Sequence, residues 1–270
     1  MKRLTLILII LFNGCGEDNF KKYASLNDFR VLGIVADKPE VSDTNETVSL
    51  TVIASDIENE GRTITQKTEG CVDPGISAGE EISCEGAQKY QLIGESNIDL
   101  NAELGGSFYT GALPSINVTV PSNILSNRTV IEQFNGVDYL IVYTFSIDGS
   151  EVLKTFKRIK VSSRVTKNSN PQITSLSSLD LNSGDQALSI VINEDPESFT
   201  YLDLLGDQNS SLEVYYLSWF TSSGEIENSQ VYVEEETKIN LGSSLPNEAV
   251  VVVFLRDGRG GLDFQVKNLP

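Results

Sequence analysis

Apolar and polar residues alternate along much of this chain with the period of two that is typical of half-buried β-strands. The clearest run is 47–54, which reads Thr-Val-Ser-Leu-Thr-Val-Ile-Ala. Sustained helical periodicity is confined to the first twelve residues, and elsewhere only 122–133 is compatible with one short helix. The pattern therefore predicts an all-β protein, and the further strands that we expect lie at 29–36, 109–120, 187–192, 212–220, 250–255 and 262–266.

Turn residues divide these runs. The apolar segments 139–147 and 152–161 flank Asp148-Gly149, and Asp-Gly between two β-rich runs is a strong hairpin signal. By contrast, 203–211 is polar and is expected to form a loop.

Polar residues gather once more at 162–171, where Ser, Asn and Thr replace large apolar side chains. This composition predicts a boundary between two domains, 28–163 and 164–270, each of a size that suits an immunoglobulin-like β-sandwich. Because the linker offers little apolar surface, we expect the two halves to unfold separately.

The N-terminus carries a targeting signal. Two basic residues precede an apolar run that ends at Phe12, and a small residue stands directly before Cys15. The run is far shorter than the roughly 20 residues that a helix needs to span a bilayer. A cysteine at this position resembles the lipobox of bacterial lipoproteins, which predicts a signal peptide at 1–14, acylation of Cys15 with palmitate-type chains, and a tether at 15–27. The expected location is the outer membrane, with the domains facing the periplasm or the cell surface.

Charge and composition narrow the choice of partners. The formal net charge is −18, and so acidic a surface repels nucleic acid and anionic lipid. The chain contains no histidine, which excludes Ser-His-Asp and Cys-His catalysis and histidine-containing zinc sites. We assign no catalytic, cofactor-binding or metal-binding residue, and expect a protein that is not an enzyme.

Three cysteines are present. If Cys15 is acylated, Cys71 and Cys84 remain as an even pair in an oxidising compartment, which favours a disulfide between them. The polar stretch that separates them would form a loop, and its closure would contribute roughly 3 kcal/mol in the chain-entropy model.

Three further features could be mistaken for sites. The glycine-rich 257–261 lacks the Gly-Lys-Ser/Thr ending of a phosphate loop, and we expect a turn between two strands. Trp219 could stack on a ligand, but a lone tryptophan in mid-strand favours the core of a sandwich. The carboxylates of 234–236 could collect calcium, but on a strand they would point to alternating faces, and we expect a solvated strand edge.

Longer motifs resemble one group of proteins. The segment 29–41, Phe-Arg-Val-Leu-Gly-Ile-Val-Ala-Asp-Lys-Pro-Glu-Val, is similar to the opening strand of uncharacterised two-domain immunoglobulin-like lipoproteins of predatory and myxobacterial-type bacteria. Cys71 and Cys84 match their paired cysteines, and 217–224 and 255–261 resemble core strands of their second domain. The resemblance implies a fold and a location but no activity.

The sequence thus favours a non-enzymatic, lipid-anchored envelope protein whose domains bind an envelope protein or polysaccharide, or act as a spacer. An alternative is a surface adhesin that binds carbohydrate or calcium. A hydrolase that uses carboxylates alone is the least favoured alternative.

Overall fold

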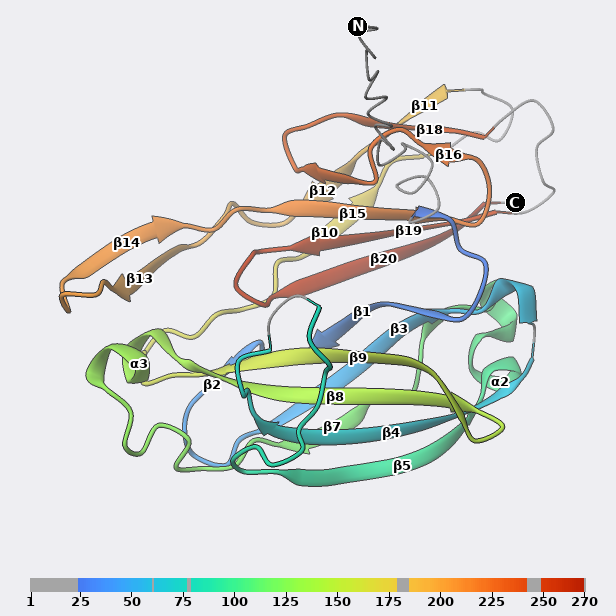
Figure 1. Ribbon diagram of the computed structural model, residues 1–270. Coiled ribbons are helices and arrows are strands. Elements are labelled where there is room, and N and C mark those ends of the chain that lie inside the picture. Colours follow the sequence, from blue (N-terminus) through green and yellow to red (C-terminus); the bar gives the residue numbers. More distant parts are fainter. Residues whose placement is uncertain (1–23, 60, 77–78, 179–184, 242–248, 270) are drawn as a thin grey trace, which may run out of the picture.

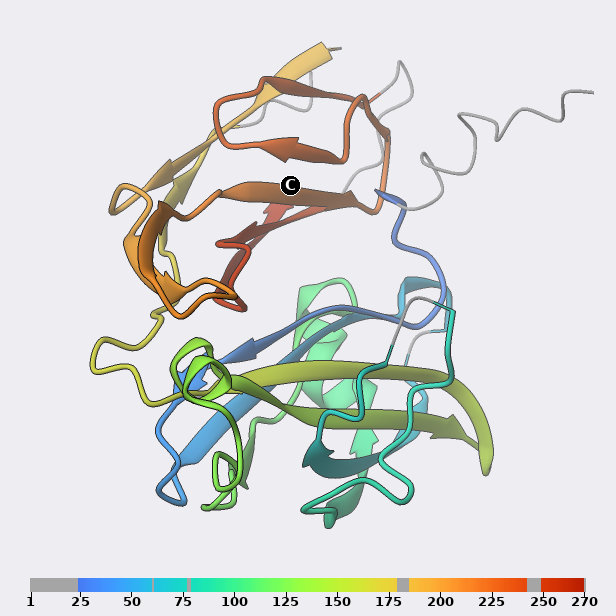
Figure 2. The same cartoon turned by 60° about the vertical axis from the view of Figure 1, so that its left-hand side comes forward.

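The computed structural model describes residues 24–59, 61–76, 79–178, 185–241 and 249–269. Within these ranges the chain is an all-β, immunoglobulin-like protein, which confirms the predicted fold class. Its sheets lie in layers on top of one another, with the N-terminal half below and the C-terminal half above in the view of Figure 1, and the rotated view keeps this order (Figure 2).

The first sandwich has two facing sheets. One has the order β2-β9-β8-β4-β5, and the other contains β1, β3, β6 and β7. Buried aromatic and aliphatic side chains fill the space between them, among them Leu50, Ile64, Tyr139 and Phe145. The strands are β1 (Arg30–Ala36), β2 (Glu40–Val41), β3 (Thr47–Ser55), β4 (Thr63–Val72), β5 (Gln91–Asp99), β6 (Thr110–Ala112), β7 (Ile116–Thr119), β8 (Val137–Ile147) and β9 (Ser150–Val161), with the short helices η1 (Ile57–Asn59), α2 (Leu100–Leu104), η2 (Gly105–Ser107) and α3 (Val130–Asn135).

Several strand predictions are confirmed in this half. Strands β1 and β3 lie within one residue of 29–36 and 47–54, and β8 and β9 pair around Asp148-Gly149. Both turn residues have positive φ, 49° and 78°, which fits the twist of a tight hairpin. The run 109–120 is interrupted and forms β6 and β7, which both pair with β3.

The second sandwich places a four-stranded sheet of order β17-β15-β19-β20 against smaller sheets, β10-β12 and β11-β18-β16. Trp219 is fully buried between them, so it is a core residue as expected. The strands are β10 (Ile173–Leu176), β11 (Asp185–Leu188), β12 (Ile190–Ile192), β15 (Tyr216–Thr221), β16 (Glu225–Ile226), β17 (Gln230–Tyr232), β18 (Thr237–Asn240), β19 (Ala249–Arg256) and β20 (Leu262–Leu269).

Three predictions need correction here. The segment 203–211 is not simply a loop, because its second half belongs to β14 (Gln208–Leu212), which pairs with β13 (Ser198–Leu202) in a hairpin that projects beyond the other strands (Figure 1). The run 187–192 changes sheets at Ser189 and contributes to both β11 and β12. The helix expected in 122–133 begins only at Val130, where Thr129 and Glu132 form a capping box.

Strand β19 explains how the two sandwiches are joined. All eight of its residues except Arg256 are buried, because alternate side chains enter two different cores. Val251 and Val253 pack inside the second sandwich, whereas Val252 and Phe254 pack against the first. This second cluster joins strands of both halves, and its buried members are Leu26, Leu32, Ile53, Phe220, Val250, Val252, Phe254 and Leu262.

This packing differs from the expectation of separable halves. The linker is polar, as the sequence showed, but its side chains bond to both sandwiches. The side chain of Asn170 donates through Nδ2 to the carbonyl of Ala36 at 2.6 Å, and its Oδ1 accepts from the backbone amide of Leu262 at 3.0 Å. The polar composition of 162–171 therefore reflects a connection fixed by hydrogen bonds.

The end of the predicted tether is also part of the fold. Ala24 and Leu26 are buried, and the amide of Leu26 donates to the carbonyl of Thr221 at 2.9 Å. Cys15 and the signal segment lie outside the described residues. Within the described ranges, no helix has the length and apolar character needed to cross a membrane.

Candidate functional site

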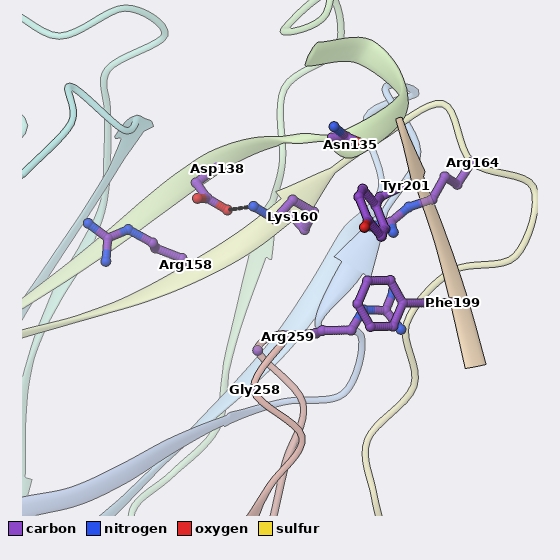
Figure 3. Close-up of a pocket in the computed structure, with 10 residues that line it drawn as sticks. Asn135, Asp138, Arg158, Lys160, Arg164, Phe199, Tyr201, Gly258 and Arg259 are labelled. Atoms are coloured by element: carbon purple, nitrogen blue, oxygen red, sulfur yellow. Dashed lines mark ion pairs between the residues drawn. The ribbon is translucent and has the colours of Figure 1, made fainter. Parts of the chain in front are cut away.

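A pocket of about 380 Å³ opens where the two sandwiches meet (Figure 3). Its volume lies in the range of small-ligand sites. Four of the chain's 20 lysine and arginine residues line it together with two aromatic rings, an unusual concentration in a protein of charge −18. The lining residues come from β8, β9, α3, the linker, β13 and the turn after β19, and they are Asn135, Asp138, Arg158, Lys160, Arg164, Phe199, Tyr201, Gly258, Arg259 and Gly260.

Strand β13 supplies the aromatic wall. Phe199 and Tyr201 are two residues apart on this strand and therefore project from the same face, with ring centroids 6.3 Å apart. The side chain of Asn135 fixes the strand in place, since it donates to the carbonyl of Leu202 at 2.7 Å and accepts from the amide of the same residue at 2.8 Å. A residue of the first half thus positions the hairpin of the second.

Glu40 organises the buried side of the pocket. Its side chain is 1% exposed and accepts from Nε and Nη2 of Arg164, both at 3.0 Å, and from the backbone amide of Asn168 at 3.0 Å. The hydroxyl of Ser162 also donates to it. Arg259 reaches the same carboxylate at 3.4 Å and pairs with the buried Glu213 at 2.7 Å. Two guanidinium groups and two carboxylates therefore neutralise one another at the junction.

The turn after β19 completes this network. Asp257 is 1% exposed, and it accepts from the side chain of Asn168 and from the amides of Arg259 and Gly261 at 2.7–2.8 Å. The guanidinium of Arg259 lies 4.3 Å from the centre of the Phe199 ring (Figure 3). Burial and the nearby carboxylate of Asp257 raise the pKa of Glu213, although Arg259 opposes the shift. The predicted turn at 257–261 is confirmed, and its residues form part of the hydrogen-bond network at the junction.

The outer wall carries cations that are more accessible. Lys160 pairs with Asp138 at 2.7 Å, and both side chains are 28% exposed. Arg158, 35% exposed, pairs with Asp73 at 2.5 Å. Burial of Asp73 would raise the pKa of its carboxyl, but hydrogen bonds from Arg158 and from the amides of Gly75 and Ile76 outweigh burial and lower the pKa.

Lys157, which precedes Arg158 on β9, connects the turn after β19 to the first sandwich. Nζ of Lys157 donates to the carbonyl of Gly260 at 2.6 Å. Burial, together with the positive charge of Arg256, lowers the pKa of Lys157 to about 8. This lysine therefore supports the pocket from outside its lining.

The structure confirms the disulfide between Cys71 and Cys84, whose Cα atoms are 5.7 Å apart. Both cysteines are buried with Leu140 and Val142 under the loop that they close. The disulfide loop also supplies Asp73, which holds Arg158 at the edge of the pocket. Cys71 and Cys84 thus act on the pocket only indirectly.

The carboxylates at 234–236 lie in the turn between β17 and β18 and not on a strand, which corrects the expected placement. Oε2 of Glu235 accepts from the amide of Tyr232 at 3.1 Å. In the part of the chain that the structure describes, no group of three or more acidic or cysteine side chains is arranged to hold a metal ion.

No family model matches the chain. No curated protein matches it either. Among solved structures, it is similar to a putative β-galactosidase from Bacteroides fragilis, with 11% identity and a TM-score of 0.32. The match covers 60% of this chain and 18% of the β-galactosidase. It is also similar to the two tandem V-type regions of a v-region-containing chitin binding protein, with 11% identity and a TM-score of 0.30 over 89% of this chain and 99% of that one. A third similar structure is the D0-D1 domain of intimin, with 11% identity and a TM-score of 0.24 over 88% of this chain and 98% of that one. Overlaps of this extent establish neither a shared ligand nor a shared activity.

Sequence reasoning did not find this pocket. Its cations are spread from 158 to 259, and its rings lie on β13, a segment for which the sequence predicted no strand, so no local motif brings them together. One signal was available, because the unbroken apolar run of β19 indicates a strand covered on both faces. Such a strand requires a second layer, and the second layer creates the junction.

Proposed function

We propose that the chain is a non-enzymatic, lipid-anchored protein of the cell envelope, and that its junction pocket is the surface that binds an envelope component. The observation that carries the binding role is the pocket itself, in which cations and aromatic rings from both sandwiches converge. Pockets of this size that combine apolar rings with a few placed polar groups are the usual form of ligand sites.

Three features support a binding module over an enzyme or a plain spacer. The chain has no histidine, which removes imidazole acid–base chemistry. The carboxylate that lines the pocket, Asp138, is paired with Lys160. Glu40 and Glu213, behind the pocket floor, are each paired with arginine and almost fully buried, so they are poorly placed to act on a substrate. A spacer has no need to place two accessible cations, Arg158 and Lys160, in one pocket with two aromatic rings.

Lipid attachment rests on the signal that ends at Cys15. Several acyl chains, each contributing about 0.8 kcal/mol per buried CH₂, make an anchor effectively permanent where a single chain does not. The expected location is the outer membrane. The alternative of a carbohydrate-binding surface adhesin gains support from Tyr201, which is 37% exposed in the pocket and provides the aromatic surface that such binding needs.

Membrane attachment is tested by fractionation of cells that express the chain with Cys15→Ser. We expect the variant in the soluble fraction and the unmodified chain in the membrane after a carbonate wash. A variant that stays in the membrane contradicts the anchor. Protease added to intact cells then decides between surface and periplasm, because only domains that face outward are digested before lysis.

The binding role is tested with envelope extract passed over the immobilised chain and over two variants. Lys160→Gln changes the outer wall of the pocket, and Leu204→Ser changes the hairpin tip, where the leucine is 94% exposed. A component held by the unmodified chain and by Leu204→Ser, and lost with Lys160→Gln, supports the proposal. Equal retention by all three, or by none, contradicts a role for the pocket.

A further inference from the structure

We propose that the junction pocket binds an acidic saccharide, a sugar whose ring carries a carboxylate, with Lys160 and Arg158 holding the carboxylate and Tyr201 packing against the apolar face of the ring. The inference rests on the proposed function, because an envelope-bound module meets such polymers at its own surface. It adds the chemical class of the ligand and the residues that select it.

The two inner cations are not available for a ligand. Arg164 and Arg259 are 9% and 14% exposed, and both pair with carboxylates that lie behind them. Separating such a buried pair leaves an uncompensated charge and is strongly unfavourable. These residues therefore form a fixed, neutralised floor against which a ligand can bind.

The two outer cations can accept an anion. The partner of Lys160, Asp138, is 28% exposed, and ion pairs this accessible contribute little to stability. Asp73 is only 10% exposed and keeps Arg158 in place, but Arg158 has five N–H donors, and those that do not bond to Asp73 or to the carbonyl of Ile76 can donate to an anion. An ammonium has three donors, and among the described residues Lys160 forms an ion pair only with Asp138. A ligand carboxylate can share Lys160 or displace Asp138 from it at low cost.

Lys160 is also held in position before a ligand arrives. Its aliphatic stem lies over Gly136, where an added Cβ would come within 2.5 Å of Cδ. Its ammonium is directed toward Asp138, and in the view of Figure 3 the lysine stem lies between Asp138 and Tyr201. A cation whose stem is already packed loses less conformational entropy when it binds an anion.

The aromatic wall favours a ring-bearing acid over an acidic side chain. One neighbour of the Phe199 ring is the stacked guanidinium of Arg259, whereas Tyr201 as a residue is 37% exposed. A sugar acid presents ring C–H groups and a carboxylate on one rigid unit, which matches an exposed aromatic residue and a cation that line the same pocket. An aspartate or glutamate side chain has no such apolar face.

The test is calorimetric titration of the full mature chain in a zwitterionic detergent with three acidic probes: trigalacturonate, a mannuronate trimer and a hyaluronan tetrasaccharide. Chitotriose serves as the neutral sugar and tri-aspartate as the acid without a ring. We expect saturable binding of at least one acidic saccharide, weakened by added salt, and at least tenfold weaker binding of chitotriose and of tri-aspartate. If none of the three acidic probes saturates, or if either control binds as tightly, the inference is wrong.

Four variants test the assigned roles. Lys160→Gln should weaken binding about tenfold, since a hydrogen bond to a charged partner is lost, and Tyr201→Ala should weaken it about fivefold through loss of the ring contact. Asp138→Asn should tighten binding about threefold, because it removes the carboxylate that competes for Lys160. Leu204→Ser should leave binding unchanged. Weaker binding by Asp138→Asn would overturn the assignment of Lys160.

The two proposals fail in different ways. If no acidic saccharide binds while envelope material is still lost with Lys160→Gln, the ligand class is wrong and the binding role stands. If both tests fail, the pocket is not a binding site.

Discussion

The strongest prediction concerns Glu40, which connects three parts of the molecule. Its carboxylate, from β2 in the first sandwich, accepts hydrogen bonds from the linker through Arg164 and Asn168 and from the turn after β19 through Arg259. Glu40→Gln keeps the shape of the side chain but replaces one acceptor oxygen with a donor and removes the charge. The guanidinium groups then face a neutral amide in a buried setting.

The size of the effect follows from burial. The side chain of Glu40 is 1% exposed and that of Arg164 is 9% exposed, so water cannot replace the lost charge. Breaking one partner of a buried pair costs about 3–5 kcal/mol. The matched control is Glu151→Gln in the same sandwich, where Glu151 is 53% exposed and lies 3.7 Å from Lys154. Exposed pairs contribute about 0–1 kcal/mol, so the control should be nearly neutral.

Urea denaturation, monitored with two spectroscopic probes, measures the loss of stability and shows whether it extends to both sandwiches. Trp219 is the only tryptophan and is buried in the second sandwich, so its fluorescence reports on that half, while far-ultraviolet circular dichroism reports on both. We expect Glu40→Gln to lower the free energy of unfolding by about 3–5 kcal/mol and to move both midpoints together. The reasoning is refuted if the Trp219 midpoint stays in place, or if Glu40→Gln is no more destabilising than Glu151→Gln.

Three other predictions test separate contacts. Gly33→Ala should destabilise the protein by about 1–3 kcal/mol, since a Cβ there would lie 2.5 Å from Cε1 of Phe254 across the junction. The control in the same urea assay is Gly94→Ala, which has open space around it, and equal effects of the two variants would contradict tight packing at Gly33. Replacing Cys71 and Cys84 together with serine should cost roughly 3 kcal/mol, and an unchanged midpoint with and without reductant would show that the disulfide is not a stabilising element. Because the pKa of Asp73 is lower in the folded state than its ordinary value near 4, the stability that it contributes is present above about pH 4 and is lost as the pH falls through the folded pKa. Asp73→Asn should therefore be less stable at neutral pH and lose less in melting temperature between about pH 4 and pH 2 than the unmodified chain, and parallel curves for the two would refute the assignment.

The sequence allowed much of the fold to be predicted because local signals decide it. Period-two alternation located β1 and β3, and Asp148-Gly149 located the β8–β9 hairpin. Strands β4 and β5 escaped prediction, since β4 reads Thr-Ile-Thr-Gln-Lys-Thr-Glu-Gly-Cys-Val and buries polar residues such as Gln66 and Thr68. These residues do not stand out as a core face in a hydrophobicity pattern.

The junction could not be predicted for a related reason. A polar segment such as 162–171 has the same composition whether it is solvated or bonded to two domains, and only the partners distinguish the two cases. Here Arg164, Lys167, Asn168 and Asn170 all find acceptors in the folded chain, so polarity marks a fixed connection. The pocket depends on this connection and was therefore hidden as well.

The central claim is that the two sandwiches form one cooperative unit whose shared junction builds the pocket. Differential scanning calorimetry of the full mature chain in a mild detergent tests it most directly. The account predicts one transition whose van 't Hoff enthalpy equals the calorimetric enthalpy, about 180 kcal/mol at roughly 0.7 kcal/mol per residue. Two transitions, or a van 't Hoff enthalpy near half the calorimetric value, would show that the halves unfold independently and would contradict the claim.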